Sequence, residues 1–214
     1  MRSCRAGCTI AAFLVLMSRS CPMRAACGAR LLALLVFAGA AGCRSIPSDP
    51  DSIDPDCRRR AAEDLAGESD DASIAQLRRL LADTHTACPS HPLVRGAAAR
   101  AIGLSGRADV IPALAAVLEK DPVLQVRIDA AWGLGQCGIP EAAAPLRAAL
   151  ARDGEAPEVR RTAARALGAL GLPAAVPDLV AALSDKDKTV RSSARDALIE
   201  ITGEDQGDDP AAWK

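Results

Sequence analysis

One short segment gathers the residue types that bind transition metals. His85, Cys88 and His91 lie close together, and the chain has no other histidine. A tetrahedral zinc site needs a fourth ligand, which Cys57 or a carboxylate would have to supply. Both histidines lie in the loop between the first and second of the repeated units described below, and no repeat itself contains a histidine. We therefore predict no metal site and no bound cofactor.

A glycine pattern typical of nucleotide binding occurs at Gly133-Leu-Gly135-Gln-Cys-Gly138. The dinucleotide motif needs a strand before it and a helix opening from it, so that the pyrophosphate meets a helix N-terminus. Here the glycines lie at the end of a predicted helix, at repeat positions where Gly168 and Gly171 also occur. No serine–histidine pair or pair of carboxylates stands out either. We predict no nucleotide site, no catalytic residues and no enzymatic activity.

A recurring dipeptide sets the register of a helical array. Val-Arg begins at Val94, Val126, Val159 and Val190, at intervals of 31 to 33 residues. With the valine as position 0, position +4 is alanine in all four copies and position +8 is Ile or Leu. These positions lie on one helical face. They are Ala98, Ala130, Ala163 and Ala194, then Ile102, Leu134, Leu167 and Leu198.

A second apolar helix follows in three of these copies. A glycine at position +12 predicts where the first helix ends, at Gly106, Gly138 and Gly171. Leucines at +20 and +24 then mark the second helix, namely Leu114, Leu146, Leu179, Leu118, Leu150 and Leu183. A weaker copy starts at Cys57. We therefore predict about five units over residues 57–205, the first and last being atypical caps.

The composition agrees with a helical array. Half of the residues are hydrophobic, yet only 2% are aromatic and none is tyrosine. A core of Ala, Leu, Val and Ile suits close-packed helices better than a sheet. One helical hairpin cannot bury its apolar face alone, whereas a stack can. The sequence predicts an all-α fold, an α-solenoid of about five helical hairpins.

The amino-acid sequence of the repeat resembles that of a known family. Residues 159–171 read Val-Arg-Arg-Thr-Ala-Ala-Arg-Ala-Leu-Gly-Ala-Leu-Gly. This segment, with two helices per unit, resembles HEAT repeats, and most closely the subtype named after phycobilisome lyases. The resemblance implies the solenoid fold, but it leaves the function open because the subtype serves many unrelated binding tasks.

Two local expectations follow from the repeats. We expect each repeated arginine to reach an acidic residue in the turn before it: Asp121, Asp153 or Asp187. Residues 206–214 predict a C-terminal cap, in which Asp209-Pro210 starts a last turn. We expect Trp213 to fold over the exposed end of the final repeat.

The N-terminus has the pattern of a targeting segment. Its apolar stretches are too short to span a bilayer, which takes about 20 residues. The second stretch, Leu31 to Ala38, follows the basic Arg24 and Arg30 and precedes small residues that end at Cys43. This order is typical of a secretory signal peptide. We predict that residues 1–42 direct export, with 1–22 a mis-assigned start before Met23.

The end of this segment resembles the lipobox of bacterial lipoproteins. It reads Gly39-Ala-Ala-Gly-Cys43, although Ala40 stands where the family usually has leucine. The resemblance implies a lipid on Cys43, and Arg44 then favours the outer membrane or periplasm over the inner membrane. An ordinary cleaved signal is the alternative. Residues 43–56, rich in Pro, Asp and Ser, predict a disordered tether.

Export would place the cysteines in an oxidising compartment, where disulfides form. Cys57 begins the first helix of its unit and Cys88 follows the second, so a helical hairpin brings both to the same end. In an oxidising compartment such a pair would close a loop and stabilise it by about 2–4 kcal/mol. We predict a Cys57–Cys88 disulfide, with two free thiols as the alternative. Cys137 is predicted to be buried only.

Charge excludes one class of partner. Residues 1–42 carry five arginines and no acid, which leaves 21 basic and 27 acidic side chains in the rest. Such an acidic body lacks the basic surface that nucleic acids need. The second helices are Ala-rich without aromatic anchors, so we expect no small-molecule substrate. We expect an unknown protein partner and membrane attachment through a lipid anchor.

One ridge departs from the repeat. At position +6, where the other copies are charged, the third has Trp132, and at +2 it has Ile128. The two side chains lie one turn apart on the same helical face. An apolar pair on a polar ridge is typical of a protein-binding anchor. The alternative is that a loop, such as that around His85 to His91, covers the pair.

These features favour a non-enzymatic protein–protein interaction scaffold of the bacterial cell envelope, in the form of a membrane-anchored lipoprotein. Two alternatives remain. The subtype's name suggests a cofactor lyase or chaperone, and a purely structural envelope component would need no discrete partner.

Overall fold

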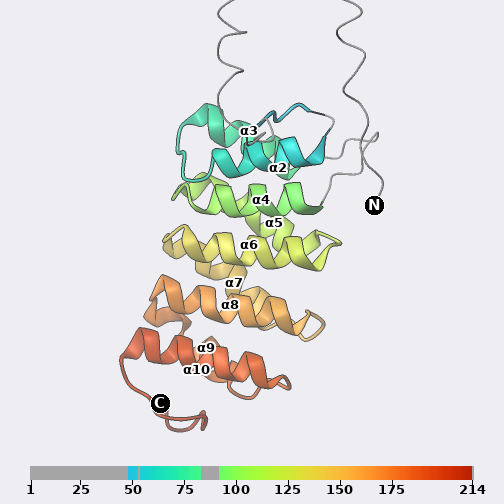
Figure 1. Cartoon of the computed structure of the whole chain (residues 1–214). Helices are drawn as coiled ribbons and strands as arrows, with labels where there is room; N and C mark the ends of the chain where they lie inside the picture. The colour runs from blue at the N-terminus through green and yellow to red at the C-terminus, as the bar shows by residue number, and fades with distance from the viewer. Residues whose placement is uncertain (1–47, 53, 83–91, 214) are drawn as a thin grey trace, which may run out of the picture. The chain divides into compact units, whose positions relative to one another are not determined.

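The computed structural model describes residues 48–52, 54–82 and 92–213, which form two layers of helices and no strand. Five first helices stack side by side in one layer (Figure 1). They are α2 (Pro55–Asp64), α4 (Pro92–Gly103), α6 (Leu124–Gln136), α8 (Pro157–Leu170) and α10 (Lys188–Thr202). The predicted all-α solenoid is confirmed.

The second layer lies behind the first in Figure 1. It contains α3 (Asp71–Leu81), α5 (Ile111–Lys120), α7 (Ala143–Leu150) and α9 (Val176–Ala182). Single 3₁₀ turns lead into three of these helices: η1 (Ala108–Val110), η2 (Pro140–Ala142) and η3 (Pro173–Ala175). Each second helix packs mainly against the first helix of the following unit. The layers therefore interlock along the whole stack.

The apolar positions predicted from the repeats form the core of the structure. The residues at positions 0, +4 and +8 of α4, α6, α8 and α10 are all 0% exposed. The leucines at +20, Leu114, Leu146 and Leu179, are 0% exposed too. Fully burying one leucine stabilises the fold by roughly 1.5–3 kcal/mol. Repeating the same set in each unit gives one continuous core.

Small residues let the first helices approach closely. A Cβ on Gly133 would lie 2.6 Å from the carbonyl oxygen of Ala99 on α4. A Cβ on Gly135 would lie 2.6 Å from the Cβ of Ala166 on α8. Gly138 has φ +65°, which ends the helix without strain. All three glycines of the nucleotide-like pattern therefore have structural roles, as the interpretation of that pattern required.

Three of the four repeated arginines form ion pairs forward along the chain, so the expectation that they pair with acidic side chains of the preceding turn was wrong. Arg95 donates to Asp121 at 2.7 and 3.0 Å, and Arg160 donates to Asp185 at 2.9 Å from two nitrogens. Arg127 donates to Glu155 at 3.0 and 3.2 Å. The second helix of each unit runs back toward the start of the first helix. The turn that follows the second helix therefore lies close to the arginine at the start of the first.

The preceding turn supplies a backbone carbonyl instead. Arg127 donates to the Asp121 carbonyl at 2.9 Å, and Arg191 donates to that of Asp185 at 2.8 Å. Asp187, expected as an ion-pair partner, accepts from the backbone N–H of Thr189 at 2.7 Å and caps α10. Each of these arginines therefore joins side chains or backbone of the turns around it rather than facing a ligand.

The fifth unit consists of α10 and a closing segment instead of a full hairpin. Arg195 on α10 pairs with Asp205 and Asp208, which holds the segment in place. Trp213 is 8% exposed within the core cluster, and its Nε1 donates to the Gly207 carbonyl at 2.9 Å. Trp213 is thus buried, and its placement over the end of the final repeat stays a prediction.

Several predictions concern residues outside the described ranges: the targeting segment 1–42, Cys43, most of the tether, and Cys88 with both histidines. The repeat domain begins with α2 at Pro55, where the side chain of Asp54 accepts from the N–H of Asp56. Within residues 48–52, 54–82 and 92–213, no helix has the length and hydropathy to cross a bilayer.

Candidate partner-binding groove

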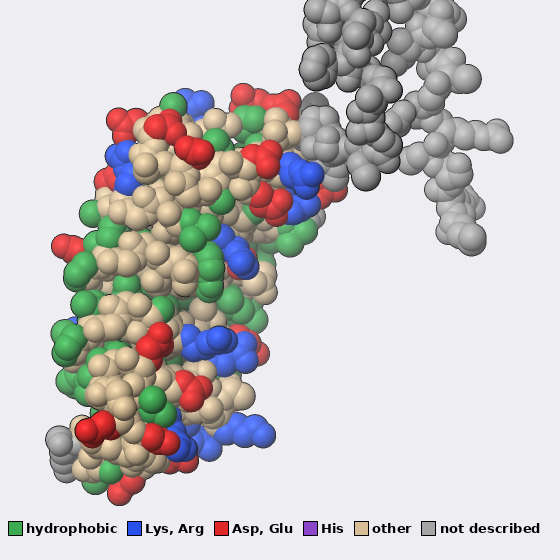
Figure 2. Space-filling view, turned by 60° about the vertical axis from the view of Figure 1, so that its left-hand side comes forward, with side chains coloured by type: hydrophobic (Ala, Val, Ile, Leu, Met, Phe, Trp, Pro, Cys, Tyr) green, Lys and Arg blue, Asp and Glu red, His purple; other side chains and the backbone are tan. Residues whose placement is uncertain are grey.

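A groove of about 1010 Å³ runs over the outer side of the first helices. We call it the first-helix groove. Its walls come from α6, α8 and α10, with Arg100 of α4 at one end. Its main side chains are Arg100, Ile128, Asp129, Trp132, Arg161, Arg165, Lys188, Asp196 and Glu200. Figure 2 shows part of the domain surface, with basic and acidic side chains close together along its right-hand side.

The predicted apolar pair lies in this groove. Ile128 and Trp132 are both half-buried, and Ile128 packs against the core. The guanidinium of Arg100 lies 4.5 Å from the centre of the Trp132 ring, within cation–π distance. The structure thus brings both residues together in a groove. Whether the loop around His85 to His91 covers them concerns residues outside the described ranges.

A buried carboxylate lies beside the tryptophan. Asp129 is 8% exposed, and its Oδ1 lies 3.7 Å from Arg100 and 3.4 Å from the amide nitrogen of Gln125. Gly96 leaves it room, since a Cβ there would lie 2.4 Å from Oδ2. Burial raises the pKa of Asp129, although Gln125 and Arg100 favour its charged form.

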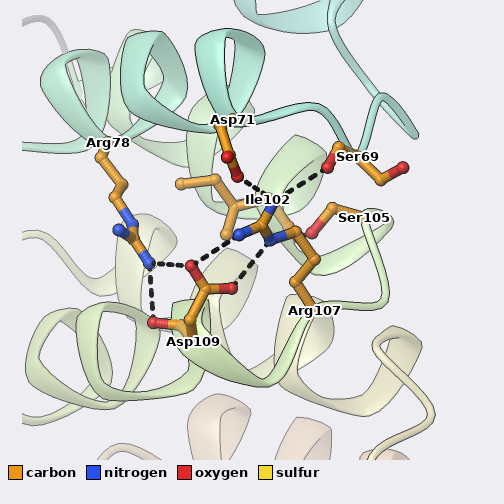
Figure 3. Close-up of polar contacts among 7 residues, drawn as sticks. All are labelled: Ser69, Asp71, Arg78, Ile102, Ser105, Arg107 and Asp109. Carbon is orange, nitrogen blue, oxygen red and sulfur yellow. Dashed lines mark hydrogen bonds and ion pairs between the residues drawn. The ribbon is translucent and has the colours of Figure 1, made fainter.

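A polar network on the other side of the stack pairs its charged groups with one another (Figure 3), although the buried Nε of Arg78 has no hydrogen-bond partner among the described residues. Arg107 donates to Asp71 at 2.6 Å, to Asp109 at 2.9 and 3.1 Å, and to the Ser69 carbonyl. Arg78 donates to the Asp109 carboxylate at 2.9 Å. Hydrogen bonding from Arg107 lowers the pKa of Asp109. This network ties α3 to the turn that precedes α5.

Metal and thiol chemistry find no support within the described part of the chain. It holds no group of three metal-ligating side chains. Cys57 is buried, and its predicted partner Cys88 lies outside the described ranges, so the disulfide stays a prediction. Cys137 is buried, and its Sγ contacts the Leu134 carbonyl at 2.9 Å. Burial raises the pKa of its thiol, so it resists ionisation, as its expected packing role implies.

Sequence reasoning missed Asp129 and the role of Arg100. The signal for Asp129 was present, because position +3 is acidic only in the third of the five copies. The stacking of Arg100 on Trp132 had no sequence signal, since the two residues belong to different units. It arises from the side-by-side packing of α4 and α6.

The comparisons with known families agree with this architecture. The family pattern for HEAT repeats matches residues 51–132, 86–154 and 118–199, which together span most of the chain. The chain belongs to the HEAT-repeat family. No curated protein matches it closely enough to count as a relative.

Three solved structures are similar to the HEAT domain. One is the complex of CpcE and CpcF of phycocyanin lyase from Nostoc sp., at 27% identity and a TM-score of 0.58, covering 77% of this chain and 68% of that one. Human deoxyhypusine hydroxylase has 22% identity and a TM-score of 0.39, covering 82% of this chain and 91% of that one. An engineered protein has 21% identity and a TM-score of 0.45, covering 71% of this chain and 76% of that one.

We predict that Asp129→Asn raises the melting temperature at neutral pH. The pKa of Asp129 is raised in the folded state, so its ionised form costs stability above that pKa. The cost disappears as pH falls below the pKa of the unfolded chain, where both states are protonated. The gain should therefore be largest near pH 7 and vanish near pH 3, as measured by thermal unfolding.

Asp196→Asn is the matched control, because it removes the same charge from an exposed position of the groove. It should change the melting temperature little at any pH. A lower melting temperature for Asp129→Asn at pH 7 would show that the contact with Arg100 outweighs the cost of burial.

Proposed function

We propose that this HEAT-repeat chain is a partner-binding subunit that holds another protein in the first-helix groove. The observation that carries the proposal is Trp132, a half-buried aromatic ring in a groove of about 1010 Å³. Tryptophan is enriched among the residues that dominate binding energies at protein interfaces. The likeness to the complex of CpcE and CpcF of phycocyanin lyase supports a protein partner.

Exposed apolar residues gather at the same units. The large hydrophobic side chains with the greatest exposure in the described ranges are Leu93, Leu104 and Leu124, at 51%, 44% and 37%. Leu93 and Leu124 belong to α4 and α6, and Leu104 directly follows α4. They add apolar area on the two units that carry Arg100 and Trp132. Apolar area of this kind is what a protein partner would remove from water.

The second-helix side is less suited to binding. Arg78 pairs with Asp109 at 2.9 Å, and Arg147 pairs with Asp178 at 2.5 Å. Because these charges neutralise each other between successive units, they offer little net field to a partner. The groove on the first helices combines an aromatic side chain with less completely paired charges.

We expect Trp132→Ala to weaken partner capture by tenfold or more while the helical content stays unchanged. Removing an aromatic anchor at an interface typically costs about 2 kcal/mol or more of binding energy. The measurement is crosslinking and pull-down with the full-length chain, followed by quantification of each captured protein against the unmodified chain.

Val180→Ala is the matched control, since Val180 is a half-buried apolar residue on α9 of the other layer. It should leave capture unchanged. Equal capture by Trp132→Ala and the unmodified chain, or an equal loss in both variants, would rule out the groove as the binding site.

A second candidate function is that of a cofactor lyase or chaperone, and it is favoured by the similarity to subunits of phycocyanin lyase. The absence of enzymatic activity stays a prediction for the same reason. Such a role requires the chain to hold a chromophore or other cofactor at some stage. The absorbance spectrum of the purified chain separates the two functions, because a bound chromophore adds a visible band.

We also propose that the chain works at the cell envelope, attached through a lipid on Cys43. The support is the apolar stretch and small residues that precede this cysteine. Cys43→Ser should abolish incorporation of a labelled fatty acid and move the chain out of the membrane fraction. Unchanged membrane association of Cys43→Ser would contradict the anchor, and a structural envelope component would show no discrete crosslinked partner.

A further inference from the structure

Two arginines in the first-helix groove have no carboxylate partner. Arg161 and Arg165 lie one turn apart on α8, and neither forms an ion pair or hydrogen bond with the described residues. Like charges at this spacing destabilise an isolated helix by about 0.2–0.5 kcal/mol. Elsewhere most arginines of the described ranges are paired, as Arg95, Arg107 and Arg160 show. The unpaired arginines Arg161 and Arg165 therefore destabilise the fold locally.

The guanidinium of Arg161 adds a second observation. Its Nε is buried and has no hydrogen-bond partner, although the side chain as a whole is half-buried. Native proteins leave few buried polar atoms unsatisfied, because each costs about 1–3 kcal/mol. The Arg161 side chain lines the groove, while its Nε itself is shielded from solvent. A carboxylate bound in the groove would pair with the positive charge of this guanidinium and offset the repulsion from Arg165.

The described acidic residues of the groove form no ion pair with Arg161 or Arg165. Asp129 is held by Arg100 and Gln125. Asp196 and Glu200 lie further along α10, at the positions equivalent to Arg165 and Ala169 of α8, and no ion pair links them to the arginines. Lys188, at the start of α10, adds a further positive charge to the groove lining. The acidic residues of the groove therefore leave Arg161 and Arg165 without an ion pair within the described residues.

We propose that the first-helix groove binds an acidic segment of a partner protein. An apolar side chain of the segment packs on Ile128 and Trp132, and its carboxylates pair with Arg161 and Arg165. Arginine suits this task because its planar guanidinium binds a carboxylate through two parallel hydrogen bonds. This inference rests on the proposed function and specifies the chemistry of the partner.

The test uses two labelled synthetic peptides and the full-length chain. One peptide carries glutamates around a central leucine and phenylalanine, and the other has lysine at each glutamate position. Fluorescence anisotropy should show at least tenfold tighter binding of the acidic peptide. Raising the salt concentration from about 0.05 to 0.5 M should weaken that binding, because it screens the charge pairs.

Paired charge reversals identify the site. Arg161→Glu with Arg165→Glu should weaken the acidic peptide at least tenfold and favour the lysine peptide. The matched control is Arg79→Glu with Lys120→Glu, which makes the same change in net charge on exposed residues of α3 and α5. It should alter binding less than twofold. Circular dichroism establishes that both double variants are folded.

The outcomes separate this inference from the proposed function. If neither peptide binds, or the control weakens binding as much as the groove variant, the acidic-segment inference is overturned. Partner capture that still depends on Trp132 would then leave the proposed function standing. Should the groove reversal not fold, Arg161→Gln with Arg165→Gln replaces it, and unchanged affinity in that variant overturns the inference.

Discussion

The close approach of the first helices constrains everything else in this fold. Gly133 faces the Ala99 carbonyl on one side of α6, and Gly135 faces Ala166 on the other. Any larger side chain at these positions would meet backbone or Cβ atoms at less than 3 Å. Moving the helices apart would open the core between them, and a cavity costs stability in proportion to its volume. The Ala- and Gly-rich composition is thus a requirement of the stack.

This spacing also fixes where polar groups can go. With one face of each first helix in the core, the positions at +2, +3, +6 and +10 are left on the outer side. There they form the first-helix groove across α6, α8 and α10. The arginines at +1 lie elsewhere, at the ends of the helices, where they bind Asp121, Glu155 and Asp185. Burial is the largest single effect on Asp185 and disfavours its charge, but the hydrogen bonds from Arg160 and the backbone N–H of Asp187, with the charge of Arg160, together outweigh it and lower the pKa of its carboxyl group.

The two sides of the stack differ in how completely their charged side chains are paired. On the second-helix side, pairs such as Arg147–Asp178 join neighbouring units and so contribute to the array itself. On the first-helix side, Arg161 and Arg165 repel each other and Trp132 keeps part of its ring at the surface. Stability alone would not select this arrangement. A surface that retains such costs is a reasonable place for binding.

The sequence by itself determined the fold and pointed to one part of the groove. Its period placed Val94, Ala98 and Ile102 and their equivalents in the core, because burial in a repeat array follows local helical spacing. A break in the same period marked Ile128 and Trp132. The tertiary structure alone decided that Arg95 pairs with Asp121, that Arg100 covers Trp132, and that Arg161 has no partner among the described residues. These contacts join residues of different helices, and they depend on how the second helix turns back and how far apart neighbouring units lie.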